Sequence, residues 1–153
     1  MKQANCGYED GVGVYGRDLL VRGGPTLIVN IGFDPAYDLN KPSRLPNLPG
    51  KGLQALIDTG ATDCCIDSDL AMQLQLPIID QGICNGISGP MPVNVHLAQI
   101  HAPDLSFTLV GRFAGVQLAS GQRHAVLIGR TFLRHFHMTY EGETGRVILV
   151  DGY

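Results

Sequence analysis

The chain has 153 residues, a formal net charge of −3 and 44% hydrophobic residues. This length predicts one domain that buries its own core. A weakly acidic chain without a basic patch lacks the charge that binds phosphate backbones, so we expect no nucleic acid partner. The 20 glycines and 9 prolines, set between short apolar runs, are typical of short strands joined by tight turns. The sequence therefore predicts an all-β fold.

Targeting signals and cysteine spacing bear on the cellular location of the chain and on its metal sites and disulfides. No run of about 18 apolar residues occurs, and the first residues, MKQANCGYED, contain no apolar core of a signal peptide. We therefore expect no membrane span in this chain, and a location in the cytoplasm or as a soluble domain of a larger or membrane-anchored protein. The 4 cysteines have neither the spacing of a disulfide framework nor that of a zinc site. We expect reduced, mostly buried thiols, no metal and no cofactor.

The first third of the chain divides into an extension, a strand and an insertion. Residues 1–25 are predicted to be a polar, glycine-rich extension, in which Leu19–Val21 is a candidate peripheral strand. The β-branched run Thr26–Phe33 predicts the first strand of a domain that spans 26–153. Prolines spread through 34–52 exclude a central strand and predict an extended surface insertion.

The segment Leu53–Ile66 contains the most informative pattern in the sequence. Its apolar run Ala55–Ile57 delivers one acid, Asp58, onto the small residues Thr59 and Gly60. This pattern predicts a strand that carries a carboxylate into a buried turn. Because a buried carboxylate without partners is costly, we expect backbone N–H groups of this turn to donate to it.

The rest of the chain is predicted to contain one helix, two hairpins and further short strands. Asp67 or Ser68 can cap the N-terminus of the helix, which Pro77 ends. Alternation of apolar and polar residues predicts half-buried strands. The expected elements, in order, are the helix Asp69–Gln75, the strands Ile78–Ile83 and Met91–Leu97 around the tip Gly86–Gly89, a strand from Leu105 to Leu109, a bend at Gly111 and Arg112, the run Phe113–Leu118, a polar turn at 119–123, the strand Ala125–Ile128, a helical turn capped by Thr131, and a hairpin of His137–Tyr140 with Arg146–Val150.

Two motifs carry a resemblance to a known family. The first is Asp58–Ala61 (DTGA), which follows the apolar run Ala55–Ile57, and the second is Leu127–Leu133 (LIGRTFL). The triplet alone recurs by chance, but two motifs with apolar flanks in this order are specific. Over residues 26–140 the chain resembles the retropepsin-like aspartic proteases, the single-domain relatives of pepsin. The resemblance implies a closed, barrel-like all-β fold with one or two short helices, and an aspartic endopeptidase.

The same resemblance implies roles for particular residues. The tip Gly86–Gly89 resembles the family's flap, a mobile hairpin that closes over the substrate and excludes water. Ile87 would then seal the tip. The implied catalytic residues are Asp58, Thr59 and Gly60, the substrate-binding residues are Ala61, Thr62, Gly86, Ile87, Ser88 and Gly89, and Gly129 and Arg130 give structural support.

The number of acids predicts the assembly. Hydrolysis of an amide by aspartates needs two carboxylates that share one proton, one acting as a base toward water and one as an acid toward the carbonyl oxygen. This chain contains one Asp-Thr-Gly run, and no second acid stands in an equivalent apolar setting. We therefore expect a homodimer whose two-fold axis brings Asp58 beside its own copy, and a polypeptide substrate. The terminal strands, with Ile148 and Val150, are candidates for the interface.

Arg130 departs from the viral pattern. In viral members the matching arginine pairs with an acid, whose position is occupied here by Thr62, with Asp63 one residue later. Either Asp63 takes this role through a shift, or backbone carbonyls satisfy Arg130.

Other functions remain open from the sequence. An Asp-Thr-Gly run also suits an ordinary β-turn. Because a fold can persist after catalysis is lost, the alternative is a catalytically silent dimerisation or peptide-binding module on a protease scaffold. His135 and His137 would share one face of a strand, which would suggest a metal site. No acid or cysteine is placed beside them, so we expect them to be ordinary surface or core histidines, and we expect the same of His96 and His101.

Overall fold

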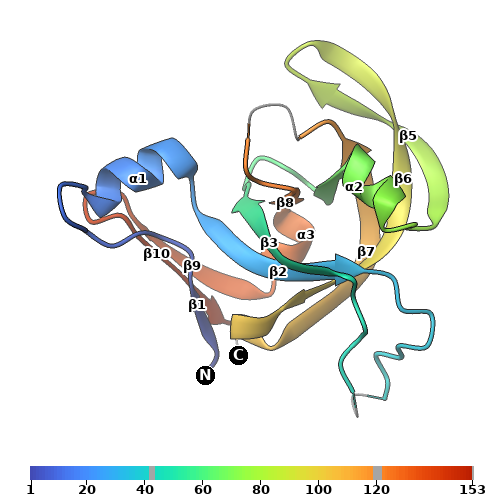
Figure 1. Cartoon of the computed structure of the whole chain (residues 1–153), viewed down its shortest axis with the longest axis horizontal. Helices are drawn as coiled ribbons and strands as arrows, with labels where there is room; N and C mark the ends of the chain where they lie inside the picture. The colour runs from blue at the N-terminus through green and yellow to red at the C-terminus, as the bar shows by residue number, and fades with distance from the viewer. Residues whose placement is uncertain (42–43, 119–121, 153) are drawn as a thin grey trace.

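The computed structural model describes residues 1–41, 44–118 and 122–152. Its strands form two sheets, one that closes into a barrel and a smaller one made from both ends of the chain (Figure 1). Buried residues of both sheets belong to one continuous core. The polar turn expected at 119–123 and the insertion expected at 34–52 lie in part outside the described residues.

The barrel closes because β2 pairs with β3 on one side and with β6 on the other. Alternate residues of β2 face the core, since Leu27, Val29 and Ile31 are buried while Ile28 is exposed. The predicted closed all-β fold is confirmed. In the closed order the strands are β2 (Thr26–Gly32), β3 (Gly50–Ile57), β8 (Val126–Ile128), β4 (Cys64–Asp67), β7 (Phe107–Val116) and β6 (Gly89–Ala102), and β5 (Ile78–Gly86) forms a long hairpin with β6.

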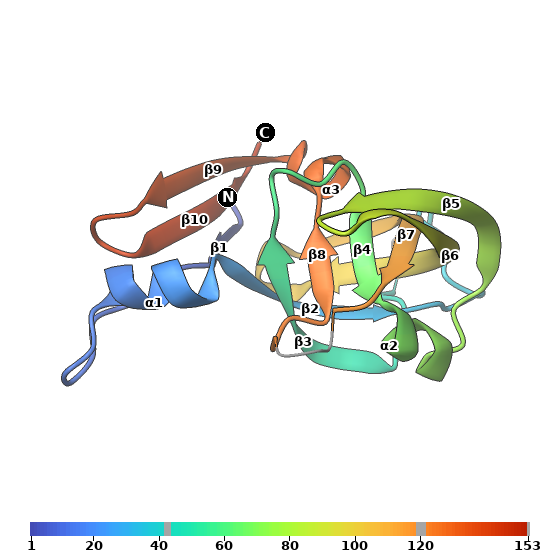
Figure 2. The same ribbon diagram turned by 90° about the horizontal axis from the view of Figure 1, so that it is seen from above.

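The smaller sheet joins the two ends of the chain. Its central strand β10 (Arg146–Asp151) pairs with β1 (Gln3–Asn5) on one edge and with β9 (Phe136–Glu141) on the other. The C-terminal hairpin expected from the sequence is therefore present. Figure 2 shows this sheet and helix α1 (Gly16–Gly23) together on one side of the barrel.

The strand expected at Leu19–Val21 is wrong, because these residues lie in α1. Within this patch Leu20 is buried, Leu19 is half-buried and Val21 is exposed. A patch of this length is too short to distinguish the period of a helix from that of a strand. Asp18 in the first turn and Arg22 in the last complement the helix dipole.

Two short helices flank the barrel. Helix α2 (Ser68–Gln73) begins as predicted, since Asp67 accepts a hydrogen bond from the Leu70 backbone N–H at 3.2 Å. Helix α3 (Arg130–Leu133) follows Gly129, so the prediction that Thr131 caps this turn is wrong. Among the described residues, no helix is long and apolar enough to cross a membrane.

The bend expected at Gly111 and Arg112 is also wrong. Strand β7 runs through both residues, which pair with Ala98 and Leu97 of β6. A continuous ladder on the neighbouring strand therefore outweighs the turn preference of one glycine. Before β7, Leu105 lies in a 3₁₀ turn, Pro103–Leu105, instead of in a strand.

The insertion after β2 is organised by one buried acid. Asp34 accepts hydrogen bonds from the backbone N–H groups of Ala36 at 3.0 Å and Asn47 at 2.9 Å, and from Nη1 of Arg44 at 2.9 Å. Its backbone is fixed by Gln99 of β6, whose side chain both donates to and accepts from it. These bonds tie the insertion back to the barrel.

Candidate active site

The loop that carries Asp58 joins β3 to β4 and crosses the end of β8, which lies between these two strands. β8 runs parallel to β3 and antiparallel to β4. The backbone N–H of Asp58 extends the first pairing by donating to the Ile128 carbonyl at 2.9 Å. At the other end of the loop, the Arg130 N–H donates to the Ala61 carbonyl at 2.9 Å. The chain around β8 thus fixes the loop on both sides of the acid.

The Asp58 carboxylate is held by its own turn. Oδ1 accepts a hydrogen bond from the Gly60 backbone N–H at 2.9 Å, which is the kind of donor that the sequence predicted. The turn itself is not buried: Asp58 is half-buried, and Thr59 and Gly60 are exposed. The expectation of a buried turn is therefore wrong for the single chain.

The guanidinium of Arg130 supports the loop from behind. Nη1 donates to the Thr59 carbonyl at 2.7 Å, and Nη2 donates to Oγ1 of Thr62 at 3.0 Å. In the described part of the chain Arg130 forms no ion pair with Asp63, so a backbone carbonyl and a hydroxyl take the place of the acid. Gly129 packs so closely that an added Cβ would overlap the carbonyl of Asp63. Both residues therefore hold the loop against α3.

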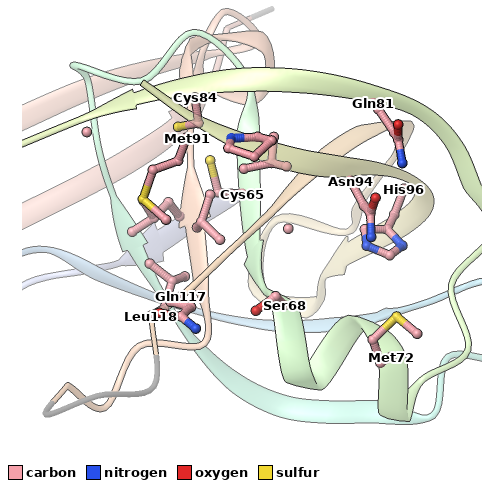
Figure 3. Close-up of a pocket in the computed structure, with 16 residues that line it drawn as sticks. Cys65, Ser68, Met72, Gln81, Cys84, Met91, Asn94, His96, Gln117 and Leu118 are labelled. Atoms are coloured by element: carbon pink, nitrogen blue, oxygen red, sulfur yellow. The ribbon is translucent and has the colours of Figure 1, made fainter. Parts of the chain in front are cut away.

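Two adjoining cavities lie between this loop and the hairpin β5–β6. Asp58 lines a cavity of about 520 Å³, and the neighbouring cavity measures about 660 Å³ (Figure 3). Side chains of β4, β5, β6 and β8 border both. The shared residues are Cys65, Cys84, Val93 and Leu127. The two cavities therefore adjoin along these four residues, and together we call them the cleft.

The tip of the β5–β6 hairpin projects beyond the cleft. Gly86 pairs with Gly89, and Ile87 and Ser88 form the turn between them. Gly89 has φ of 98°, a conformation that favours glycine. Gly86 lines the larger cavity, whereas Ile87 is fully exposed and borders neither cavity of the cleft.

Residues 47–132, more than half of the chain, match the family described as Aspartyl protease. The chain belongs to the aspartyl protease family. Among solved structures it is similar to the simian foamy virus (mac) protease, at 15% identity over 71% of this chain and 91% of that chain, with a TM-score of 0.46. It is also similar to the EIAV protease in complex with the inhibitor HBY-793, at 17% identity over 72% of this chain and 85% of that chain, with a TM-score of 0.45. No curated protein matches the sequence.

The cleft contains some of the expected site residues together with others that the sequence did not reveal. Gly60, Ala61 and Thr62 line the cavity of Asp58, as the motif implied. Asp63, Ile83 and Arg112 line it as well. The sequence does not reveal Ile83 and Arg112 because they are distant from the Asp58 loop along the chain. The pairing of β5 with β6 and of β6 with β7 brings them to the cavity.

The adjacent cysteines Cys64 and Cys65 point to different surroundings, as the alternation of a strand requires. Cys64 is buried at 1% exposure, whereas Cys65 is half-buried and borders both cavities. Burial raises the pKa of the Cys65 thiol to about 12, with a smaller contribution from the neighbouring Cys84. All four cysteines of the chain are free thiols.

His135 and His137 do not form a metal centre in the part of the chain that the structure describes. His135 packs against the ring of Phe107, with centroids 5.0 Å apart, and His137 is exposed on β9. Among the described residues, no group of three or more histidine, cysteine, aspartate or glutamate side chains is placed to bind an ion. His96 and His101 are both buried.

Proposed function

We propose that this chain is an aspartic endopeptidase whose catalytic group is Asp58, acting with the Asp58 of a second copy. The observation that carries the proposal is the position of this carboxylate. One of its oxygens is held by the Gly60 N–H, and the residue lines a cleft large enough for peptide side chains. Membership of the aspartyl protease family supports the same assignment.

The proposed reaction needs one ionised and one protonated carboxylate. The ionised carboxylate takes a proton from water while the water oxygen forms a bond to the amide carbonyl carbon. The protonated carboxylate gives its proton to the carbonyl oxygen, which yields a tetrahedral intermediate. When the intermediate collapses, the C–N bond breaks, the nitrogen takes a proton, and a carboxylic acid and an amine leave.

The second carboxylate comes, in this proposal, from a homodimer. Thr59 and Gly60 are exposed in the single chain, so a symmetry mate has access to the face on which Asp58 lies. Thr59 would bond across the axis to the partner's loop, and the tip Gly86–Gly89 would act as the flap. Since β10 pairs on both edges within its own chain, Ile148 and Val150 are available to a partner through their side chains only.

The substrate class follows from the cleft. The shared lining residues Cys65, Cys84, Val93 and Leu127 are apolar or weakly polar, so they match apolar side chains of an extended polypeptide. We infer an endopeptidase that prefers apolar side chains at the cleaved bond.

The test is incubation of the protein with a mixed peptide library, with the products read by mass spectrometry. Cleavage by the wild type and its loss in Asp58→Asn are expected. Asp69→Asn removes an equal charge from the exposed face of α2 and should cleave as the wild type does. Asp63→Asn tests the other acid at the cavity and should retain cleavage. Binding of peptides without cleavage by the wild type would instead support the silent peptide-binding module.

A further inference from the structure

The larger cavity has two chemically different ends (Figure 3). Near the shared border with the Asp58 cavity it is lined mainly by sulfur-containing and aliphatic side chains, with Gln117 beside Leu118. At the other end, Gln81, Asn94 and His96 lie together. No charged side chain lines this cavity in the described chain. The residues of the first end are Cys65, Cys84, Met91, Leu118 and Leu127.

His96 is the polar group that is best defined at this end. It is 1% exposed, and its Nδ1 lies 3.2 Å from the Leu76 carbonyl oxygen. Because a carbonyl only accepts, Nδ1 carries the hydrogen and donates. In the neutral ring Nε2 is then an acceptor. Nε2 has no hydrogen-bond partner among the described residues, although the ring lines the cavity.

Gly115 lies close to Nε2 of His96. A Cβ added to Gly115 on β7 would lie 3.1 Å from Nε2 of His96, which is closer than such contacts normally are. Gly115 does not have positive φ, so its backbone conformation does not demand glycine. Without a side chain at Gly115, Nε2 avoids this close contact. No fully enclosed side-chain nitrogen or oxygen of the described residues lacks a hydrogen-bond partner, so the unpaired Nε2 keeps some accessible surface.

We propose that this cavity binds a tyrosine side chain of the polypeptide substrate, with Nε2 of His96 accepting the hydrogen bond of the phenol. The ring would pack against the sulfur-containing side chains of Cys65, Cys84 and Met91, and sulfur makes favourable contacts with aromatic rings. A side chain with an apolar body and one donor at its tip matches a cavity that is apolar at one end and has an acceptor at the other. Ionised side chains find no opposite charge there. The inference rests on the proposed function, because the tyrosine belongs to the peptide bound at Asp58.

The selectivity follows from the unpaired acceptor. Phenylalanine fills the same volume but leaves Nε2 without a partner, and an unsatisfied buried acceptor is costly. We expect a preference of about tenfold or more for tyrosine over phenylalanine at one position of the peptide.

The test uses octapeptides with leucine at both central positions, in which tyrosine or phenylalanine occupies each other position in turn. Cleavage is measured with the wild type as kcat/KM. Binding is measured with Asp58→Asn by calorimetry, which does not depend on catalysis. The expected result is one position at which tyrosine is preferred in both measurements.

Two variants assign the preference to this site. In His96→Asn the side-chain amide can still donate toward the Leu76 carbonyl, but the acceptor inside the cavity is lost. Gly115→Ala fills the space beside Nε2 and leaves the imidazole in place. In both variants the ratio of tyrosine to phenylalanine peptides, in binding and in kcat/KM, should fall toward one, whereas His101→Asn, which lies outside the cleft, should keep the wild-type ratio.

The outcomes are separable. If the wild type cleaves no peptide, the proposed function fails. If it cleaves but treats tyrosine and phenylalanine alike at every position, or if both variants keep the preference, this inference is overturned and the function stands. Failure of Asp58→Asn to bind any peptide of the series also overturns the inference. Thermal unfolding of each variant checks that the fold is intact.

Discussion

Nη1 of Arg130 donates a hydrogen bond to the carbonyl oxygen of Thr59 at 2.7 Å. The bond joins the second sequence motif to the residue that follows the proposed catalytic acid. Nη2 of the same guanidinium holds the hydroxyl of Thr62. The planar guanidinium thus spans the loop at two points, a geometry that a lysine ammonium cannot reproduce.

Arg130→Ala should loosen the loop of Asp58 and lower kcat/KM for peptide cleavage. Arg130 is exposed, so the cost in the free energy of unfolding is about 1 kcal/mol, the typical net value of a hydrogen bond and less than a buried charged group would give. Urea unfolding and peptide cleavage are the measurements. Arg134→Ala is the matched control, because this exposed arginine near the same helical turn makes no side-chain bond in the described chain. Equal activity of both variants would contradict the supporting role of Arg130.

Activity should depend on pairs of chains. Specific activity is expected to fall on dilution as dimers dissociate. When equal amounts of wild type and Asp58→Asn exchange subunits at random, about one quarter of the dimers carry two aspartates, so activity should fall below half. Asp69→Asn chains, added in the same way, should not lower the activity of the wild type. Activity strictly proportional to the wild-type fraction would mean that each chain works alone.

The insertion after β2 should become less stable in acid. Hydrogen bonds from the Asn47 N–H and from Arg44 lower the pKa of Asp34 below its ordinary value. A lowered pKa in the folded state contributes stability that is present above the unfolded value of 3.8 and is lost as pH falls through the folded value. Urea unfolding at pH 6 and at about pH 3 should therefore show a larger acid loss for the wild type than for Asp34→Asn.

Asp38→Asn is the control for this measurement, because Asp38 is exposed and its carboxylate holds only the Asn40 N–H. Its acid loss should equal that of the wild type. If Asp34→Asn and the wild type lose the same stability, the carboxylate of Asp34 does not organise the insertion.

The buried thiol of Cys6 should make the fold sensitive to alkali. Burial, with a smaller contribution from Asp104, raises the pKa of this thiol from 9.0 to about 12. Since the unfolded chain ionises this group first, folding stability is retained below about pH 9 and is lost as pH rises toward 12. Unfolding free energies of the wild type and Cys6→Ala should run parallel from pH 7 to 8 and converge above pH 9. Parallel curves at every pH would show that Cys6 does not ionise on unfolding in this range.

The sequence predicted the parts of the fold that depend on local pattern. Alternation predicts the strand β6, and two runs around a glycine-containing turn predict the C-terminal hairpin. Asp67, one of two candidate helix caps, is predictable because its role depends on the next few residues. The strand predicted at Leu19–Val21 is wrong because three apolar residues fit the period of a helix as well as that of a strand. Burial of Leu20 in the core favours the helix.

The site was predicted in part for a related reason. Asp58 and its loop are contiguous in sequence, so the motif identifies them. Cys84 and Arg112 join the cleft only through pairing between distant strands, and no local pattern marks them. The degree of burial of Asp58 was also out of reach, because it depends on what covers the loop and not on the residues of the loop.

Closure of the barrel through β2 and β6 has a consequence for self-association. Every barrel strand has neighbours on both sides, so the unpaired backbone of this sheet lies on β5. Exposed isoleucines, Ile78, Ile79 and Ile83, lie along that strand. A long apolar edge strand is a template on which strands of other molecules can pair, and each added strand exposes a new edge for the next one. Aggregation of this protein at high concentration should therefore start at β5, as an open-ended process distinct from the closed two-fold assembly that we propose at Asp58.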